Sequence, residues 1–462
     1  MVQLKRLLLL FLTVVLFYSC KTTPPKQAVR NDFFQRVAVL LETDDFDGAL
    51  ALFDALPEAE AALPEVKVAK SSILLSAGKV SAARAVVEDL IKQDAGNIEA
   101  RYVLSVVESR QKKLRQQRIV LEDIVKESPN YVPALNDLGR ISIENSKNLK
   151  KAASYYDAAL NADPANEDSI IGRARVYKLA KKYDEAIGVL TKGIQLRPRS
   201  ASMYNERGRI YRTIGNLDEA MADMNEAVKF DPNDYWFSYD RALALLAQNQ
   251  KKEALEEFKR ASSIDPSIFI AYVYTAGISD ELGFDDEAIK NYKKIISIKP
   301  DYYFGFEGLG VQSLKKGDYA QAADSFLQAW GKAPSEINYA LLSAYCRLKA
   351  AKGSKEGRNA IKPFLNEAIK QVKRDSIDYY VLRLYAEGAG DSDVALRVEK
   401  EPNTIAKFRA VFYLACYYDT TGIPTLSQKY AEDFREFNRR DLIEYRINDF
   451  LHPVSSGVAS KN

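Results

Sequence analysis

Residues 201–234 read ASMYNERGRIYRTIGNLDEAMADMNEAVKFDPND, and this stretch decides the fold. Apolar and small residues recur every three or four positions on both sides of a polar turn, which predicts two amphipathic helices. Gly208, Ala220 and Ala227 are small enough to let these helices, and the helix that follows, approach closely. Pro232 cannot continue a helix and therefore marks the end of the second one. The stretch predicts one helical hairpin.

The proline that ends this hairpin belongs to a series with a nearly constant spacing. One interval of 35 residues and five of 34 separate Pro129, Pro164, Pro198, Pro232, Pro266, Pro300 and Pro334. A fixed period of this length indicates a stack of copies, because a single hairpin cannot bury its own apolar face. Only 16 Pro and 22 Gly occur in the 462 residues, which suits a largely helical chain.

The copies resemble the tetratricopeptide repeat. Repeat positions 4, 8, 11, 20, 27 and 32 of the family pattern correspond here to Tyr204, Gly208, Tyr211, Ala220, Ala227 and Pro232. Residues 303–336 match the same pattern. The resemblance implies an all-α fold, an α-solenoid of helix-turn-helix repeats wound into a right-handed superhelix.

Residues at the helix ends predict the turns within the better copies. Gly215, Gly283 and Gly317 are expected to end first helices in the left-handed conformation. Acidic pairs such as Asp218-Glu219 are expected to open second helices, because carboxylates are stabilised near the positive end of the helix dipole.

The strength of the repeat pattern divides the chain into five parts. Residues 1–19 are predicted to be a lipoprotein signal peptide and residues 20–30 a flexible tether. Residues 31–131 are expected to form divergent helical repeats, and residues 132–336 tetratricopeptide repeats. Residues 337–462 are expected to form degenerate helical repeats that end in a capping helix.

Two further expectations concern prolines and the C-terminal helix. Pro24 and Pro25 are expected to keep the tether from forming a helix. Pro363 is expected in the first turn of a helix, where proline is tolerated. The final stretch RRDLIEYRINDFL is predicted to be the capping helix, polar on one face.

The N-terminus resembles a bacterial lipoprotein signal. Residues 1–20 read MVQLKRLLLLFLTVVLFYSC, in which a basic start precedes an apolar run too short for a comfortable bilayer span. Ser19 and Cys20 resemble a lipobox, whose cysteine becomes the first mature residue and carries acyl chains. This implies a membrane anchor of palmitate-type chains on Cys20 and a bacterial cell envelope location, periplasm-facing or at the surface. A plain signal peptide is the alternative.

Composition argues against an enzyme. His452 is the only histidine, which excludes most histidine-based catalysis and metal sites. No phosphate-binding, hydrolase or metalloprotease motif has credible spacing, so no catalytic residue, no metal and no cofactor are expected. The net charge of +3 creates no attraction to nucleic acid. Cys346 and Cys416 are expected to be buried free thiols, because repeats in a solenoid touch only their neighbours.

The resemblance also implies a binding surface. In this family the first helices line the concave face, mainly through repeat positions 2, 5, 9, 12 and 13. These positions predict a partner-binding groove of Asn136, Arg140, Arg175, Lys178, Asn205, Arg209, Arg212, Trp236 and Tyr239. Arg can hold a carboxylate through two hydrogen bonds, Asn can bond peptide groups, and Trp and Tyr can anchor an apolar side chain. Alternatively, the charges are those that any groove contains, and Trp236 and Leu243 pack on the next repeat.

A second set of arginines recurs at repeat position 7. Arg173, Arg207 and Arg241 are 34 residues apart. They would form either a basic ladder for a ligand or a structural set whose stems pack on the neighbouring helix, and we favour the structural interpretation.

Together these features predict a non-enzymatic scaffold or adaptor, anchored to the bacterial envelope, that binds an extended segment of a protein partner. The alternative is a substrate- or ligand-binding accessory protein of an envelope transport system, which requires an enclosed pocket rather than an open groove.

Overall fold

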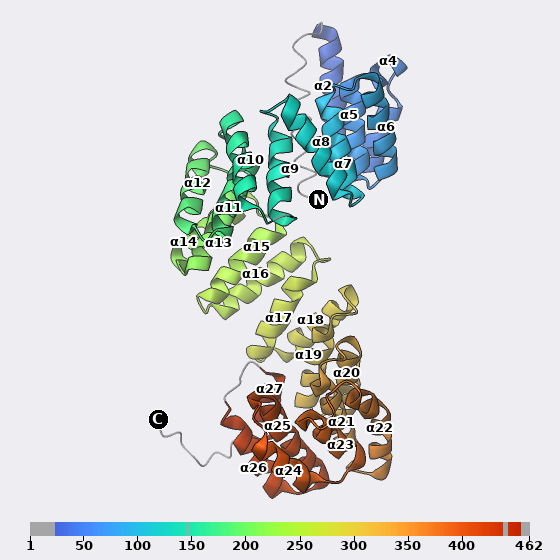
Figure 1. Cartoon of the computed structure of the whole chain (residues 1–462), viewed down its shortest axis with the longest axis vertical. Coiled ribbons are helices and arrows are strands. Elements are labelled where there is room, and N and C mark those ends of the chain that lie inside the picture. Colours follow the sequence, from blue (N-terminus) through green and yellow to red (C-terminus); the bar gives the residue numbers. More distant parts are fainter. Residues whose placement is uncertain (1–23, 146, 438–441, 454–462) are drawn as a thin grey trace. The chain divides into compact units, whose positions relative to one another are not determined.

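The computed structural model describes residues 24–145, 147–437 and 442–453, and these ranges contain α-helices and no strand (Figure 1). The chain divides into two compact units, Met1–Phe230 and Asp231–Asn462. The all-α prediction is confirmed. The boundary between the units falls inside the segment 132–336, which the repeat pattern groups as one array, and it lies between two hairpins.

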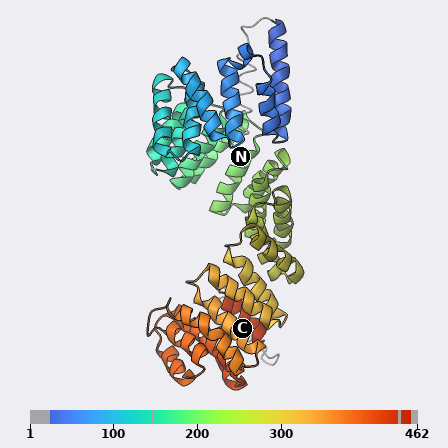
Figure 2. The same cartoon turned by 90° about the vertical axis from the view of Figure 1, so that its right-hand side faces the viewer.

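Unit 1 consists of stacked hairpins, seen from a second direction in Figure 2. Its helices are α2 (Pro24–Glu42), α3 (Phe46–Asp54), the single turn α4 (Glu58–Ala61), α5 (Pro64–Ser76), α6 (Val80–Gln93), α7 (Ile98–Arg110), α8 (Leu114–Glu127), α9 (Val132–Glu144), α10 (Leu149–Ala162), α11 (Glu167–Leu179), α12 (Tyr183–Leu196), α13 (Ala201–Ile214) and α14 (Leu217–Phe230).

Unit 2 continues with the same kind of hairpin and then departs from it. Its helices are α15 (Tyr235–Ala247), α16 (Lys251–Ile264), α17 (Phe269–Glu281), α18 (Asp285–Ile298), α19 (Tyr303–Lys315), α20 (Tyr319–Lys332), α21 (Ile337–Ala350), α22 (Lys355–Ile369), α23 (Ile377–Glu387), α24 (Asp391–Lys400), α25 (Thr404–Thr421), α26 (Pro424–Arg435) and α27 (Ile443–Leu451).

The turns inside the hairpins share one conformation from the first hairpin to the fourth hairpin of unit 2. A residue with positive φ follows each first helix, at intervals of 34 or 35: Asp44, Gly78, Lys112, Lys147, Lys181, Gly215, Asn249, Gly283, Gly317 and Lys352. The predicted left-handed glycines are therefore confirmed. The period also extends upstream through residues 31–131, where Asp44 and Lys112 adopt at the turns a conformation that favours glycine.

The prolines of the series end the second helices as predicted. Helix α14 ends at Phe230, two residues before Pro232, and α16 ends at Ile264, two residues before Pro266. Close contacts explain the small residues: a Cβ on Gly310 would lie 2.6 Å from the ring of Phe326. Gly310 thus has a packing role.

Two proline expectations are wrong. Helix α2 already begins at Pro24, because a proline in a first turn lacks only an N–H that would be unsatisfied anyway. The helix therefore occupies residues 24–30 of the predicted tether, and residues 20–23 lie outside the described residues. Pro363 lies inside α22 rather than in its first turn, because the cap at Ser354, whose side chain accepts from the Gly357 amide, starts that helix earlier.

In the C-terminal part of unit 2, first helices two hairpins apart touch each other. The Tyr413 hydroxyl on α25 donates to the carbonyl of Asn338 on α21 (2.9 Å), and the Tyr345 hydroxyl donates to Asp419 (2.8 Å). Residues of α21, α23 and α25 share one apolar core. The expectation that only neighbouring repeats touch is therefore wrong for this part of the chain.

The predicted capping helix has a different role from the one its polar face suggests. Helix α27 does pack on the preceding hairpin, through Phe434 and Tyr445. However, its polar residues Glu444 and Asn448 are buried, and its Arg446 reaches Asp280 on α17. The helix thus lies between two parts of unit 2 instead of presenting a polar outer face.

Candidate functional site

The charged and amide side chains of the predicted groove lie on three consecutive first helices of unit 1. Asn136 and Arg140 belong to α9, Arg175 and Lys178 to α11, and Asn205, Arg209 and Arg212 to α13. The 34-residue period places equivalent residues at the same turn of neighbouring helices. We call this set the unit 1 face.

Of the two amides of the unit 1 face, Asn136 forms contacts between helices and Asn205 is buried. The Nδ2 of Asn136 donates to Asn166 Oδ1 (3.1 Å), and its Oδ1 accepts from the Ser169 hydroxyl (2.7 Å). Asn205 is only 4% exposed. Asn136 therefore helps to stack α9 on α11.

Carboxylates are interleaved with the cations of the unit 1 face. Arg140 contacts Asp137 (2.9 Å) and Glu144 (3.1 Å), and Arg175 lies 3.9 Å from Glu144. A similar pattern recurs two hairpins later, where Glu206 lies 2.8 Å from Arg209 and 3.7 Å from Lys178. Sequence reasoning missed these acids, although the spacing of three or four residues from Arg140 and Arg209 was a usable signal. The face is of mixed charge rather than basic.

Arg212 differs from the other arginines of the face. Its Nε is buried and has no hydrogen-bond partner among the residues that the structure describes. An N–H that is buried without a partner costs free energy in the folded state. Because this atom is buried, a ligand carbonyl or carboxylate reaches it only if the Arg212 side chain moves.

The aromatic members of the predicted groove belong to α15, in unit 2. Trp236 is 49% exposed, and its ring meets Tyr239 edge-on, with 5.6 Å between the centroids. Tyr239 is held by Phe258 (5.5 Å) and Tyr274 (5.8 Å), and burial together with Tyr274 raises the pKa of its hydroxyl well above its usual range. A large indole fixed on a supported ring is a suitable anchor for an apolar side chain.

The arginines at repeat position 7 have structural partners. Arg207 makes two hydrogen bonds to Asp223 (2.8 and 2.7 Å), and Arg241 binds Glu257 on the second helix of its own repeat. Arg173 instead contacts Asp157 of the preceding repeat (2.6 Å). The structural interpretation of these residues is confirmed, and each ties a first helix to a second one.

The two internal cysteines are buried and free, as predicted. Burial raises the pKa of both thiols, so neither has the character of a reactive cysteine. The described residues contain no cluster of three or more potential metal ligands. Cys20 lies outside the described ranges, within which no helix has the length and apolar character needed to cross a bilayer.

A shallow pocket lies between α8 and α9 and is open to solvent. It is lined by Leu114, Arg115, Arg118, Ile141 and Asn145. This pocket is not the enclosed cavity that the ligand-delivery alternative requires.

Comparison with known proteins identifies the repeats. The tetratricopeptide repeat family model matches residues 132–166, 201–234 and 238–268. No curated protein is significantly similar to the chain in sequence.

Solved structures of similar fold are short relative to this chain. A tetratricopeptide repeat protein from Parabacteroides merdae is 20% identical over 53% of this chain and 96% of its own, with a TM-score of 0.41. The protein MamA is 24% identical over 36% and 96%, with a TM-score of 0.34. PilF of Pseudomonas aeruginosa is 15% identical over 44% and 92%, with a TM-score of 0.38.

Proposed function

We propose that this tetratricopeptide repeat protein is a non-enzymatic scaffold, anchored by lipid to the bacterial envelope, that holds a protein partner on its first helices. Tetratricopeptide repeats bind protein or peptide partners, so a role in protein–protein interaction follows from the matched repeats themselves. The anchor and the residues that contact the partner are our own assignment.

One observation carries the assignment of the surface. On the unit 1 face, Arg212 keeps a buried Nε without a partner among the described residues. Arg209 lies on the same helix as Arg212, and Arg175 lies on the preceding first helix. The side chains of Arg175 and Arg209 are 49% and 41% exposed. A peptide with backbone carbonyls and with side chains of both charge signs complements such a face. It can form ion pairs with Arg175 and Arg209, and it can accept from the Arg212 Nε once that side chain turns outward.

The exposed indole of Trp236 would bind a second part of the partner. Exposed tryptophan on a rigid support is costly to keep in water and dominates many protein interfaces. We assign Trp236 to an apolar side chain of the partner and Arg212 to its backbone or a carboxylate.

Cross-linking in the native envelope, followed by mass spectrometry, identifies the partner. A pull-down then compares the wild type with Arg209→Ala/Arg212→Ala and with Trp236→Ala, and each variant is expected to lose at least tenfold in partner recovery. Lys229→Ala on α14 and Phe284→Ala in a turn are matched controls, because both side chains are exposed outside the first-helix positions. Full recovery with both groove variants would refute the surface assignment.

The anchor is tested separately. We expect radiolabelled palmitate to be incorporated into the wild type and not into Cys20→Ser, which should also leave the membrane fraction. Unlabelled wild-type protein would reduce the N-terminus to a plain signal peptide. This result is independent of the pull-down.

A further inference from the structure

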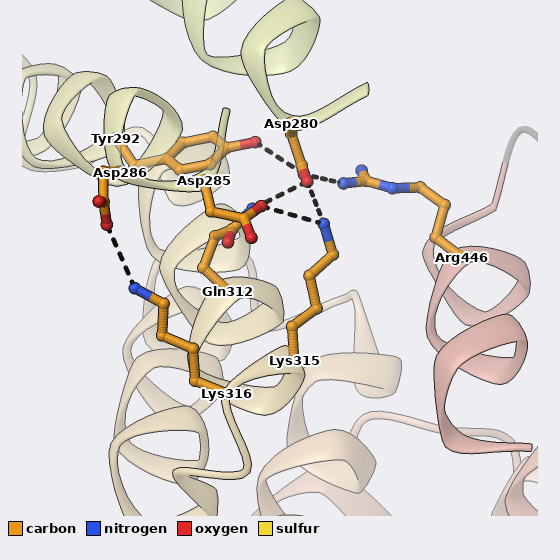
Figure 3. Close-up of polar contacts among 8 residues, drawn as sticks. All are labelled: Asp280, Asp285, Asp286, Tyr292, Gln312, Lys315, Lys316 and Arg446. Carbon is orange, nitrogen blue, oxygen red and sulfur yellow. Dashed lines mark hydrogen bonds and ion pairs between the residues drawn. The ribbon is translucent and has the colours of Figure 1, made fainter. Parts of the chain in front are cut away.

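Helix α27 covers part of the first-helix surface of unit 2. Arg446 on α27 forms an ion pair with Asp280, which lies at repeat position 12 of α17 and whose side chain is 2% exposed (Figure 3). Arg446 and Asp280 are 166 residues apart in sequence. A face that the family uses for partners is thus occupied here by a segment of the same chain.

The acidic site beneath Arg446 is complete without α27. Asp280 accepts from Gln312 Nε2 (2.8 Å), from the Tyr292 hydroxyl (3.5 Å) and from Lys315 (Figure 3). All three partners lie on α18 and α19, so removal of α27 leaves the buried carboxylate paired. The penalty that normally accompanies the breaking of a buried ion pair is therefore small here.

A second carboxylate makes the site specific for a cation with several donors. Glu307 on α19 accepts a hydrogen bond from the Tyr339 hydroxyl. Burial raises the pKa of the Glu307 carboxyl, and Tyr339 and Arg446 act against this shift by favouring the charged form. Asp280 and Glu307 thus present two carboxylates from neighbouring first helices. A guanidinium, with its planar set of N–H groups, matches such a pair better than an ammonium does.

Two buried polar groups at α27 lack hydrogen-bond partners within the described ranges, unlike the Asp280 carboxylate that the helix covers. Its buried polar groups include Asn448 Oδ1 and, just beyond the helix, His452 Nε2, and neither has a hydrogen-bond partner among the residues that the structure describes. Glu444 is 4% exposed and buries a carboxylate. Ile447 is the one fully buried apolar side chain of this nine-residue helix. The apolar side chains of Ile443, Tyr445, Phe450 and Leu451 are partly buried against the core of unit 2, so their contacts act against the cost of these unsatisfied polar groups.

We propose that α27 is a displaceable internal ligand, and that its removal opens a second binding site for an amphipathic partner helix that inserts an arginine between Asp280 and Glu307. The partner replaces the Arg446 contact and places an apolar residue where Ile447 lies. This site shares no residue with the unit 1 face or Trp236. Its test is therefore independent of the test of the proposed function.

The test uses the full chain and a fluorescein-labelled peptide with the sequence of residues 442–453 as the probe. We expect weak binding to the wild type and at least tenfold tighter binding to Arg446→Asp, whose own α27 is repelled by the two carboxylates. Asp449→Ala, an exposed change in the same helix, should bind like the wild type. A peptide that carries glutamine in place of Arg446 should lose at least tenfold in affinity for the Arg446→Asp chain.

Three outcomes would overturn the proposal. In the first, the Arg446→Asp chain keeps the wild-type helical content but binds the peptide no better than the wild type does. In the second, the variant unfolds as a whole. Either result makes α27 an integral part of unit 2. Alternatively, light scattering shows that the variant exchanges α27 with a second copy and forms dimers. Hydrogen exchange on the wild type gives an independent check: amides of α27 should exchange at least tenfold faster than those of α25, and equal protection contradicts displacement.

Discussion

The same repeat position is exposed on a first helix of unit 1 and buried on a first helix of unit 2. At repeat position 9, Arg209 on α13 keeps a side chain that is 41% exposed, whereas Tyr345 on α21 is completely buried. The difference is the packing of α25 on α21, which turns the first-helix surface of that hairpin into core. A position in a repeat therefore predicts which way a side chain points, and the elements that later pack on it decide whether it binds a partner or stabilises the fold.

The largest effect should come from truncation at this shared position. Tyr345→Ala removes a buried ring and its bond to Asp419, and we expect a loss of about 3–5 kcal/mol in the free energy of unfolding of unit 2. Arg209→Ala should change stability by about 0.5 kcal/mol or less. Urea denaturation followed by tyrosine and tryptophan fluorescence measures both. Similar costs for the two variants would contradict the contrast between an open and a covered face.

The close packing between helices should be equal in the two units. A Cβ on Gly172 would lie 2.2 Å from the ring of Tyr156, and one on Gly308 would lie 2.2 Å from the ring of Tyr292. Overpacking predicts that Gly172→Ala and Gly308→Ala each destabilise by about 1–3 kcal/mol in thermal denaturation. Gly331→Ala is the control, because a Cβ there meets nothing within 4 Å. Its helix should gain up to about 1 kcal/mol.

The shared turn should respond to glycine in a predictable direction. Lys181 has a φ of 59°, in the region that glycine tolerates best, so Lys181→Gly should stabilise unit 1 by up to about 1 kcal/mol. Gly317, with a φ of 74°, occupies the equivalent turn in unit 2, and Gly317→Lys should destabilise by a similar amount. Chemical denaturation of each variant checks the signs. A loss with Lys181→Gly would show that the lysine side chain contributes more than the strain.

The smallest effect concerns the pH dependence of the covered region. Burial raises the pKa of the Glu444 carboxyl above its ordinary value of 4.5, because the charged form is poorly solvated there. The folded state then binds the proton more tightly than the unfolded state does. The stability from this group is therefore full below the ordinary pKa and is lost as pH rises through the raised one.

With Glu444→Gln, the free energy of unfolding should therefore fall less as the pH rises from the ordinary carboxyl pKa to neutral pH. The variant should also slow hydrogen exchange of the α27 amides at neutral pH. Glu436→Gln, an exposed neighbour, should keep the wild-type profile. Identical profiles for the wild type and Glu444→Gln would contradict the burial of a costly carboxylate on α27.

Much of the fold followed from local chemistry. The proline series and the small residues at Gly208, Ala220 and Ala227 predicted hairpins whose ends the structure reproduces, because helix termination and close approach depend on residue type alone. The divergent repeats expected over residues 31–131 keep the same period, although Lys112 and Asp44 occupy turns where glycine was the expected signal.

For the candidate sites, less could be predicted from the sequence than for the fold. Repeat register placed Arg209, Arg212 and Trp236 on first helices, but it could not say that Asn136 is used between helices or that Glu206 neutralises its neighbours. Those facts depend on which side chains meet across a hairpin boundary.

By itself, the sequence determined the all-α repeat architecture, its period and the turns marked by glycine. These follow from the conformational limits of proline and glycine and from the need of each hairpin to bury one face. Only the tertiary structure decided that α25 covers α21 and that Arg446 meets Asp280. Contacts between residues far apart in the chain depend on how successive hairpins stack, and no local pattern records them.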